Sequence, residues 1–252
     1  GLRGDVAALR RLDALTVRRA PVSEPEFDGA EPAGGATPHL DDVSAGYDGS
    51  TLLVGVTARV LLGHRVVVTG PSGSGKTAIA RLLARFVDPV AGALDLGGVA
   101  YDELTSATVR EHVGLVDDEP HVFATTLAGN LRVADPDATD DELVDALGAA
   151  GLGRFYEGLE LGLATALGGA GVGLSGGERR RLGVARELLA DRPVAVFDEP
   201  TEGLDDAAAA ELSATLRRRY ATRALVIVSH REDELAGASR WHVGNARVEV
   251  TP

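Results

Sequence analysis

The sequence predicts an α/β fold whose parallel β-sheet core is preceded by an antiparallel sheet and interrupted by a helical insertion. Short apolar runs that end in polar residues are typical of buried parallel strands, and four occur, at 66–69, 113–116, 194–197 and 225–228. The first run leads through a glycine loop into a helical pattern with Ile79, Leu82, Leu83 and Phe86. The 252 residues are enough for one such domain with a sizeable core.

Composition excludes several classes of protein. The formal net charge of −13 argues against a nucleic-acid-binding surface, which is normally basic. The sequence has no Cys, so disulfides and thiolate metal sites are impossible. No apolar run approaches the roughly 20 residues that a membrane-spanning helix needs, and no signal peptide is visible. We therefore expect a soluble chain with no nucleic-acid partner.

The first 38 residues predict a helix and a linker ahead of the domain. Up to about residue 20, Leu and Val recur at spacings of three and four among arginines, as in a helix with one apolar stripe. This helix is either an amphipathic surface helix or the cytosolic end of a preceding helix. Residues 20–38 are rich in Pro, Gly, Ala and Glu and predict a linker with little fixed structure. We therefore expect the domain to occupy residues 39–252.

Residues 40–68 predict the antiparallel sheet, because short β-type runs are broken there by glycines such as Gly46, Gly55 and Gly63. Tyr47 lies at a turn in this region. Its ring either belongs to the core or offers a face on which an adenine ring can stack. Further hairpins are predicted at residues 95–99 and 241–250.

Residues 70–77 read Gly-Pro-Ser-Gly-Ser-Gly-Lys-Thr and match the phosphate-binding pattern G-x-x-x-x-G-K-[ST] between a strand and a helix. The glycines let consecutive N–H groups point at an anion, and the following helix adds its positive N-terminal end. Lys76 would bridge the outer phosphates of a nucleotide, and the Thr77 hydroxyl would coordinate Mg²⁺. The predicted nucleotide-binding residues of this loop are Gly70, Ser72, Gly73, Ser74, Gly75, Lys76, Thr77 and Ala78.

Residues 121–190 predict a helical subdomain that contains a second anion site. Near its end, Ser175-Gly176-Gly177-Glu178 opens an arginine-rich helix. Ser175 is a good N-cap, and the glycines leave backbone N–H groups exposed at the positive end of the helix. This segment lies about 100 residues after the glycine loop, so we expect it to form a separate anion site.

Three of the predicted parallel strands deliver polar groups to one edge of the sheet, where ligands bind in such folds. The run 194–197 ends in Asp198 and Glu199. Neighbouring residues of a strand point to opposite faces of the sheet, so the two carboxylates can have different functions. Asp198 can hold Mg²⁺, and Glu199 can act as a general base toward water. His230 follows the run 225–228 and is a candidate γ-phosphate sensor. Asp118 follows the run 113–116 and lies in a run of three acidic residues, 117–119.

In their order along the chain, these motifs resemble those of the nucleotide-binding domain of the ABC ATPases, over about residues 39–250. The resemblance implies a RecA-like P-loop NTPase core, with ATP and Mg²⁺ as cofactors. It also implies a second cassette, so that each ATP lies between the glycine loop of one cassette and the signature of the other. It assigns the A-loop to Tyr47, Walker A to 70–77, the signature to 174–178, Walker B to the strand ending in Asp198 with Glu199, the D-loop to 203–205 and the switch to His230. It makes Glu199, His230 and Lys76 the catalytic residues and Ser175, Gly176, Gly177 and Glu178 the contacts to the partner's nucleotide.

A narrower resemblance concerns the exporters. Residues 120–130 resemble the exporter segment that contacts the membrane domain, which implies a transmembrane partner at residues 118–130 and a place at the cytoplasmic face of the bacterial plasma membrane. Residues 1–38 would then continue from a preceding transmembrane domain. Residues 198–205 resemble the CydC half of the thiol-reductant exporter needed for cytochrome bd assembly. That resemblance implies cysteine, glutathione or haem as cargo and a CydD-like subunit as the second cassette.

Two departures from the family pattern concern the coupling of ATP hydrolysis to the membrane domain. Asp118 stands where the family has its Q-loop glutamine, and it could hold Mg²⁺ through water without mimicking the amide. The exporter segment before the signature, at 167–171, lacks its usual glutamate. Two alternative functions remain: a regulatory half that hydrolyses ATP poorly, and a soluble ABC ATPase of DNA repair or translation.

Overall fold

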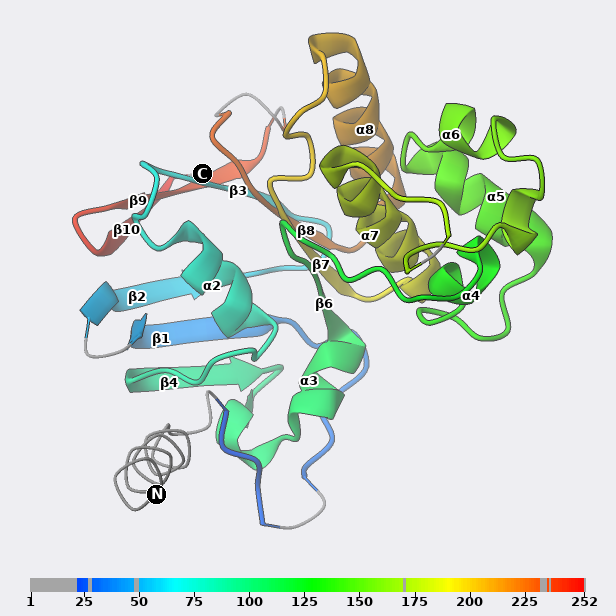
Figure 1. Ribbon diagram of the computed structural model, residues 1–252. Helices are drawn as coiled ribbons and strands as arrows, with labels where there is room; N and C mark the ends of the chain where they lie inside the picture. The colour runs from blue at the N-terminus through cyan, green and yellow to red at the C-terminus, as the bar shows by residue number, and fades with distance from the viewer. Residues whose placement is uncertain are drawn as a thin grey trace, which may run out of the picture.

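In the part of the chain that the structure describes, the larger of two β-sheets has six strands in the order β10-β9-β3-β8-β7-β6 (Figure 1). The computed structural model describes residues 22–26, 29–47, 50–169, 171–231, 235 and 237–251. The parallel strands are β3 (Arg65–Thr69), β6 (Val113–Val116), β7 (Val194–Asp198), β8 (Ala224–Val228) and β9 (Ser239–Gly244). The last strand, β10 (Arg247–Thr251), pairs antiparallel with β9. The predicted parallel core and the C-terminal hairpin are confirmed.

Alternate residues of the parallel strands face two separate cores, because successive side chains of a strand point to opposite faces. In β7, Val194 and Val196 pack on the face covered by α2 (Lys76–Leu83) and the smaller sheet. Ala195 and Phe197 pack against helices on the other face. All four side chains are fully buried. The continuous apolar run in the sequence is thus explained by burial on both faces.

The smaller sheet is antiparallel, as predicted, with the order β2-β1-β4-β5. Its strands are β1 (Pro38–Tyr47), β2 (Ser50–Arg59), β4 (Ala91–Leu96) and β5 (Val99–Ala100). Gly55 does not break its strand as expected. It has a φ of 63° within β2, where the register against β1 shifts, so a bulge lies at the predicted break.

The helix after the glycine loop ends earlier than its apolar pattern suggests. α2 stops at Leu83, and Arg85 has a φ of 50°, which an α-helix does not accommodate. Phe86 therefore lies outside the helix and is 43% exposed. After β5 the chain continues through the 3₁₀ turn η1 (Tyr101–Glu103) and α3 (Ser106–His112) into β6.

The predicted helical insertion lies between β6 and β7. It contains α4 (Leu127–Leu131), α5 (Asp140–Ala149), α6 (Gly153–Glu157), η2 (Gly162–Ala164) and α7 (Gly176–Ala190), and α8 (Asp206–Arg219) follows β7. Figure 1 shows α4, α5 and α6 grouped beyond α7, on the side away from α2 and the smaller sheet. In the part of the chain that the structure describes, no helix has both the length and the apolar character needed to cross a membrane.

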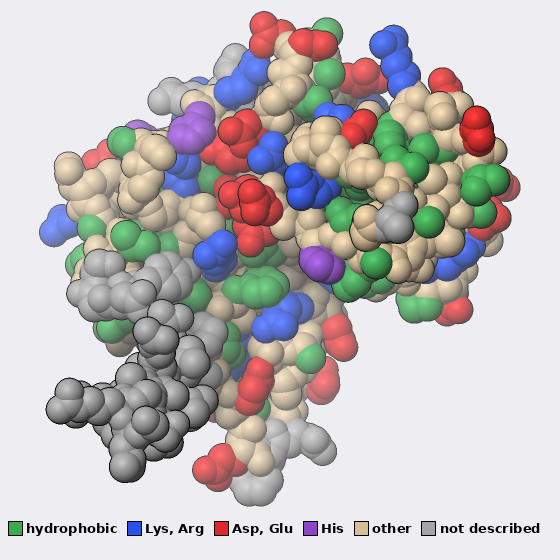
Figure 2. Space-filling view, viewed as in Figure 1, with side chains coloured by type: hydrophobic (Ala, Val, Ile, Leu, Met, Phe, Trp, Pro, Cys, Tyr) green, Lys and Arg blue, Asp and Glu red, His purple; other side chains and the backbone are tan. Residues whose placement is uncertain are grey.

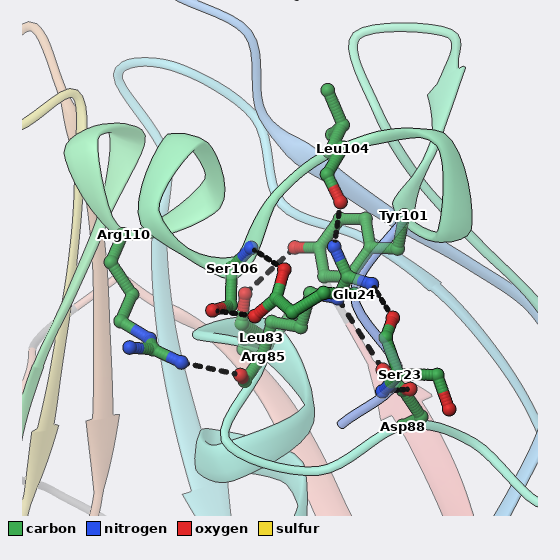
Figure 3. A network of polar contacts seen from close by, with 9 residues as sticks. All are labelled: Ser23, Glu24, Leu83, Arg85, Asp88, Tyr101, Leu104, Ser106 and Arg110. Carbon is green, nitrogen blue, oxygen red and sulfur yellow. Dashed lines mark hydrogen bonds and ion pairs between the residues drawn. The ribbon is translucent and has the colours of Figure 1, made fainter. Parts of the chain in front are cut away.

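A short segment ahead of the first strand is bonded to the domain, and we call residues 22–26 the N-terminal strap (Figure 3). The carbonyl oxygen of Ser23 accepts a hydrogen bond of 2.8 Å from Arg85, whose side chain is fully buried. The carboxylate of Glu24 accepts bonds from the backbone N–H of Ser106, at 2.9 Å, and from the hydroxyl of the same residue. The strap therefore connects the end of α2 to the start of α3.

These contacts contradict the expectation of little fixed structure throughout residues 20–38. The guanidinium of Arg85 is buried and needs acceptors, and it finds them in the carbonyl oxygens of Leu104 and Ser23. The composition of the strap could not show this, because the acceptor is a backbone carbonyl and its donor lies 62 residues away. The predicted helix over about residues 1–20 lies outside the described residues.

Candidate active site

The glycine loop turns sharply between β3 and α2. Gly70, Gly73 and Gly75 have φ values of 146°, 73° and 108°, a range that residues with a Cβ rarely adopt. At Gly70 a Cβ would also lie 2.2 Å from the carbonyl oxygen of Val243 on β9. The loop is therefore held close to the sheet in a curled conformation that suits the binding of an anion by backbone N–H groups.

Lys76 and Thr77 begin α2 and connect the loop to its surroundings. The Nζ of Lys76 donates to the carbonyl oxygens of Gly70, at 2.9 Å, and Pro71, at 3.0 Å, so the side chain spans the loop. The hydroxyl of Thr77 donates to Oδ2 of Asp198 at 2.8 Å. The amine and the hydroxyl thus lie where phosphates bound in the loop would meet them.

Asp198 and Glu199 face different partners, as their positions on the strand predict. Asp198 continues the alternation of β7 onto the face covered by α2, which explains its bond to Thr77. Glu199 has a φ of 51°, so the extended strand ends there, and its N–H donates to the carbonyl oxygen of Val228 at 2.9 Å. Its carboxylate lies 3.0 Å from Nε2 of His230, which follows β8.

The site gathers more carboxylates than cations, and several pKa values respond to this. Burial raises the pKa of Asp198 and of Glu199. A hydrogen bond with Asp117, together with burial, raises the pKa of Asp118. Burial also raises the pKa of Asp117, but its hydrogen bonds with Asp118 and Arg81 outweigh this and the net shift is downward. A bound cation would relieve the repulsion among these groups.

One cleft of about 450 Å³ brings most of the predicted residues together, but Gly70 and Ser74 do not line it. It is lined by Ser72, Gly73, Gly75, Lys76, Thr77, Ala78, Asp118, Asp198, Glu199 and His230. Figure 2 shows acidic side chains gathered near the centre of this face of the molecule, with basic ones beside them. The side chain of Tyr47 lies outside the described part of the chain, so its stacking on adenine stays a prediction.

Three residues that line the cleft were missed by the sequence analysis: Leu52, Arg81 and Glu202. Arg81 lies four residues after Thr77, so helical spacing could have placed both on one side of α2. It forms an ion pair of 3.3 Å with Asp117. Glu202 belongs to the turn after Glu199, and nothing in its spacing marks it as part of the cleft.

Ser175 caps α7, as predicted. Its hydroxyl accepts a hydrogen bond from the N–H of Glu178, and the carboxylate of Glu178 accepts bonds from the N–H and hydroxyl of Ser175 at 2.8 and 2.7 Å. The carboxylate of Glu178 is thus engaged in the cap. The glycines Gly176 and Gly177 follow with the positive end of the helix.

The signature residues do not line the glycine-loop cleft. Ser175, Gly176 and Gly177 line a second pocket of about 500 Å³, together with the three arginines at 179–181. Asp118 and Glu202 line both this pocket and the first cleft. The chain therefore carries two separate pockets that share a boundary, and binding of an anion in the second one stays a prediction.

The groups in the first cleft fit a magnesium nucleotide. The Oγ of Ser74, in the glycine loop between the lining residues Gly73 and Gly75, is buried with no hydrogen-bond partner. In the described residues, His, Asp and Glu form no group of three or more that could hold a metal ion by itself. A cation bound here would therefore share its ligands between Thr77, Asp198 and phosphate oxygens, which is how Mg²⁺ is usually held.

A parallel sheet whose edge carries a glycine loop, an Asp-Glu pair and a histidine around one cleft defines a P-loop ATPase. A family model described as "ABC transporter" matches residues 53–202. The chain belongs to the ABC transporter family, and it is the ATPase domain of that family.

Two relatives and one solved structure illustrate the similarity. The ATP-dependent lipid A-core flippase of Chromobacterium violaceum is 37% identical over 221 residues, which are 86% of this chain and 38% of that protein. The mycobactin import ATP-binding/permease protein IrtB of Mycolicibacterium thermoresistibile is 38% identical over 208 residues, 82% of this chain and 36% of that protein. The structure of a bacterial Atm1-family ABC exporter with ATP bound matches with a TM-score of 0.85 at 28% identity, covering 98% of this chain and 44% of that one. The chain spans less than half the length of each.

Proposed function

We propose that this chain is the ATP-hydrolysing motor of a membrane exporter. The observation that carries the proposal is the arrangement of two surfaces on one chain. The cleft holds the side chains that bind and cut a triphosphate, namely Lys76, Thr77, Asp198, Glu199 and His230. The neighbouring pocket holds the signature residues Ser175, Gly176 and Gly177.

Nucleotide binding uses the glycine loop and the first turn of α2. The amine of Lys76 exchanges its carbonyl acceptors for phosphate oxygens, and the N–H groups of the loop surround the phosphates. Thr77 and Asp198 would hold Mg²⁺, and Asp118 would be a further candidate ligand. The ion would supply positive charge close to the transferring phosphoryl group.

Hydrolysis depends on Glu199. Its raised pKa makes it a better proton acceptor than an ordinary carboxylate, so it serves as the general base toward water. His230 lies beside it, where it orients the carboxylate and contacts oxygens of the γ-phosphate. Lys76 stabilises the same oxygens as charge develops on them.

A second cassette completes each site. Because Ser175 and its glycines lie outside the glycine-loop cleft of their own chain, they are available to cover a nucleotide held by another chain. The partner is a second ABC cassette, and we propose a different, CydD-like subunit on the strength of the resemblance at residues 198–205. ATP then lies between the two chains, and hydrolysis releases them.

The membrane partner is proposed at residues 118–130. Here His121 and Phe123 pack edge to face with ring centroids 4.8 Å apart, and Phe123 stays 40% exposed. Arg186 fixes this segment by donating to the carbonyl oxygen of His121 at 2.7 Å. A transmembrane domain docked on this surface would place the cassette at the cytoplasmic face of the bacterial plasma membrane.

The proposed direction of transport and the proposed cargo are both based on similarity to other proteins. The structural neighbour is titled an exporter and the first relative is named a flippase, which support export, whereas the other relative is named for mycobactin import. Thiols such as cysteine or glutathione, or haem, are proposed as cargo, supported by the CydC-like residues 198–205. No nucleic acid is involved in this proposal.

A second candidate function is favoured by Asp118. A carboxyl group bonded to Asp117 stands where an amide would sense the nucleotide, which suits a regulatory cassette that binds ATP and hydrolyses it poorly. The experiment that separates the two is the measurement of phosphate release by the protein as its gene encodes it, with Mg²⁺ or EDTA, alone and with its partner cassette. A motor releases phosphate only with Mg²⁺. A regulatory half binds ATP with no release of its own, and absence of ATP binding contradicts both.

A further inference from the structure

An ion pair joins the signature helix to the turn that follows the catalytic carboxylate. Arg180 lies on α7, five residues after Ser175, and its Nη2 contacts Oε2 of Glu202 at 3.0 Å. Its Nη1 donates to the backbone carbonyl oxygen of Glu202 at 3.1 Å. One guanidinium therefore holds both the side chain and the backbone of Glu202.

Glu202 is in turn bonded to Glu199. The N–H of Glu202 donates to the carbonyl oxygen of Glu199 at 3.2 Å, which closes a tight turn over residues 199–202. Glu199 opens this turn with a positive φ, a conformation that is costly for a residue with a side chain and persists only where the surroundings fix it. The path from the signature helix to the backbone of Glu199 thus consists of two hydrogen-bonded contacts.

The two ends of this path differ in rigidity. α7 is fixed on the sheet by buried residues of its next turn, Leu182, Gly183 and Val184. The turn 199–202 is a loop, and the side chain of Glu202 is 62% exposed. Arg180 is only 14% exposed, so it is the better-fixed member of the pair. The contact therefore restrains the loop relative to the helix.

We propose that Arg180 and Glu202 are positioning residues, which hold the turn bearing Glu199 in register with the signature helix of the same chain. The inference rests on the proposed function, because it assigns a role in the hydrolysis that Glu199 performs. Since Glu202 lines both the nucleotide cleft and the signature pocket, the pair lies at the boundary of the two surfaces. A nucleotide that is bound by the partner cassette and contacts the start of α7 would therefore affect the position of Glu199.

The pair is expected to affect turnover more than stability. An ion pair with one exposed partner contributes little to folding, because solvent screens it and the side chains lose freedom. A small misplacement of a catalytic group, in contrast, lowers the rate strongly. Loss of the pair should therefore lower kcat while KM for ATP and the melting temperature stay nearly unchanged.

The test compares Arg180→Ala, Glu202→Ala, the double variant and the reversed pair Arg180→Glu with Glu202→Arg. Each is made in the protein as its gene encodes it. We expect each single variant to lose about three- to tenfold in kcat with KM within about twofold. The double variant should lose no more than the worse single variant, because both remove the same contact. The reversed pair should recover part of the rate.

The matched control is Arg132→Ala in the helical insertion. Arg132 makes the same kind of contact, with Nε donating to the carbonyl oxygen of Ala138 at 3.1 Å and Nη2 to Asp140 at 2.6 Å, and it lines neither the cleft nor the signature pocket. Its kcat should equal that of the wild type. Any variant that melts earlier is replaced by Arg180→Lys or Glu202→Gln, for which a smaller loss in kcat is expected.

Three outcomes in kcat alone overturn the inference while leaving the proposed function intact: wild-type kcat in both single variants, an equal loss in the control, or losses that multiply in the double variant. A raised KM with unchanged kcat also overturns it, because that result would place Arg180 on the nucleotide. A wild-type protein that binds Mg-ATP and releases no phosphate overturns the proposed function, and the inference with it.

Discussion

Oε1 of Glu199 lies 3.0 Å from Nε2 of His230, although the two residues follow different strands. The contact arises because β7 and β8 are parallel neighbours, so that their carboxyl ends meet at one edge of the sheet. The side chain of Glu199 is 17% exposed, and that of His230 is 56% exposed. A partly buried carboxylate thus lies beside a more accessible imidazole.

Replacing Glu199 with Gln should stall turnover and leave ATP binding intact. The amide keeps the size of the side chain but cannot accept the proton from water. General-base catalysis is worth about 10²–10⁴ in rate, so steady-state phosphate release should fall by that factor. Glu211→Gln on the exposed face of α8 is the control and should behave as the wild type. Near-normal hydrolysis by Glu199→Gln would show that another group is the base.

Replacing Lys76 with Ala should lower the affinity for ATP itself, by about tenfold or more, because a charge-assisted bond to phosphate is lost. Equilibrium binding of a fluorescent ATP analogue measures this. Lys76 is also the only lysine in the sequence, so an amine-reactive reagent offers an independent measurement on the unmodified protein. Mg-ATP should protect the peptide that contains Lys76 from acylation, as detected by mass spectrometry. Equal labelling with and without nucleotide would contradict the site.

Glu187 on α7 should make stability depend on pH. Its side chain is 3% exposed, one carboxylate oxygen has no partner, and burial raises its pKa from 4.5 to about 7 despite the ion pair with Arg192. A carboxyl whose folded pKa exceeds its unfolded pKa stabilises the fold fully below the unfolded value, and this contribution is lost as pH rises through the folded value.

Between about pH 5 and pH 8, the free energy of unfolding should therefore fall by about 1–3 kcal/mol more in the wild type than in Glu187→Gln. Urea denaturation at the two pH values measures the difference. Glu160→Gln, an exposed carboxylate, should retain the wild-type dependence. The same fall in Glu187→Gln as in the wild type would mean that Glu187 is ionised throughout this range.

Removal of the Glu24 carboxylate in the N-terminal strap should lower the free energy of unfolding of the domain modestly. Glu24→Ala and Ser106→Ala each remove a hydrogen-bonded contact, and each should cost about 1 kcal/mol, since Glu24 is exposed. The double variant should cost less than the sum, because the two side chains share one interaction. Glu26→Ala, an exposed neighbour, is the control. Additive losses in the double variant would show that Glu24 and Ser106 act independently.

The fold was predictable where its signals are local. The buried strands were recognised because both faces of the sheet are covered, which leaves runs such as 194–197 wholly apolar. The end of α2 was missed because Phe86 keeps the helical spacing while Arg85 leaves the helical conformation. The strap was missed because its partners are distant in sequence and partly backbone.

The residues of the candidate site were likewise predictable where their signals are local in the sequence. The glycine loop and the Asp198-Glu199 pair are contiguous motifs with a stated chemistry, so their residues could be named in advance. Arg81 with Asp117 and Arg180 with Glu202 join segments 36 and 22 residues apart, and neither pair leaves a pattern in the sequence. Only the packing of α2 and α7 on the sheet brings them together.

The strap also sets the route by which tension would enter the domain. Its bonds are to Arg85, just past the end of α2, to Asp88, and to Ser106, the first residue of α3. A pull on the chain ahead of Val22 would be borne by these contacts. Because Arg85 directly follows a helix of only eight residues whose opposite end is Lys76, the strap connects the chain ahead of the domain to the helix that begins at the glycine loop.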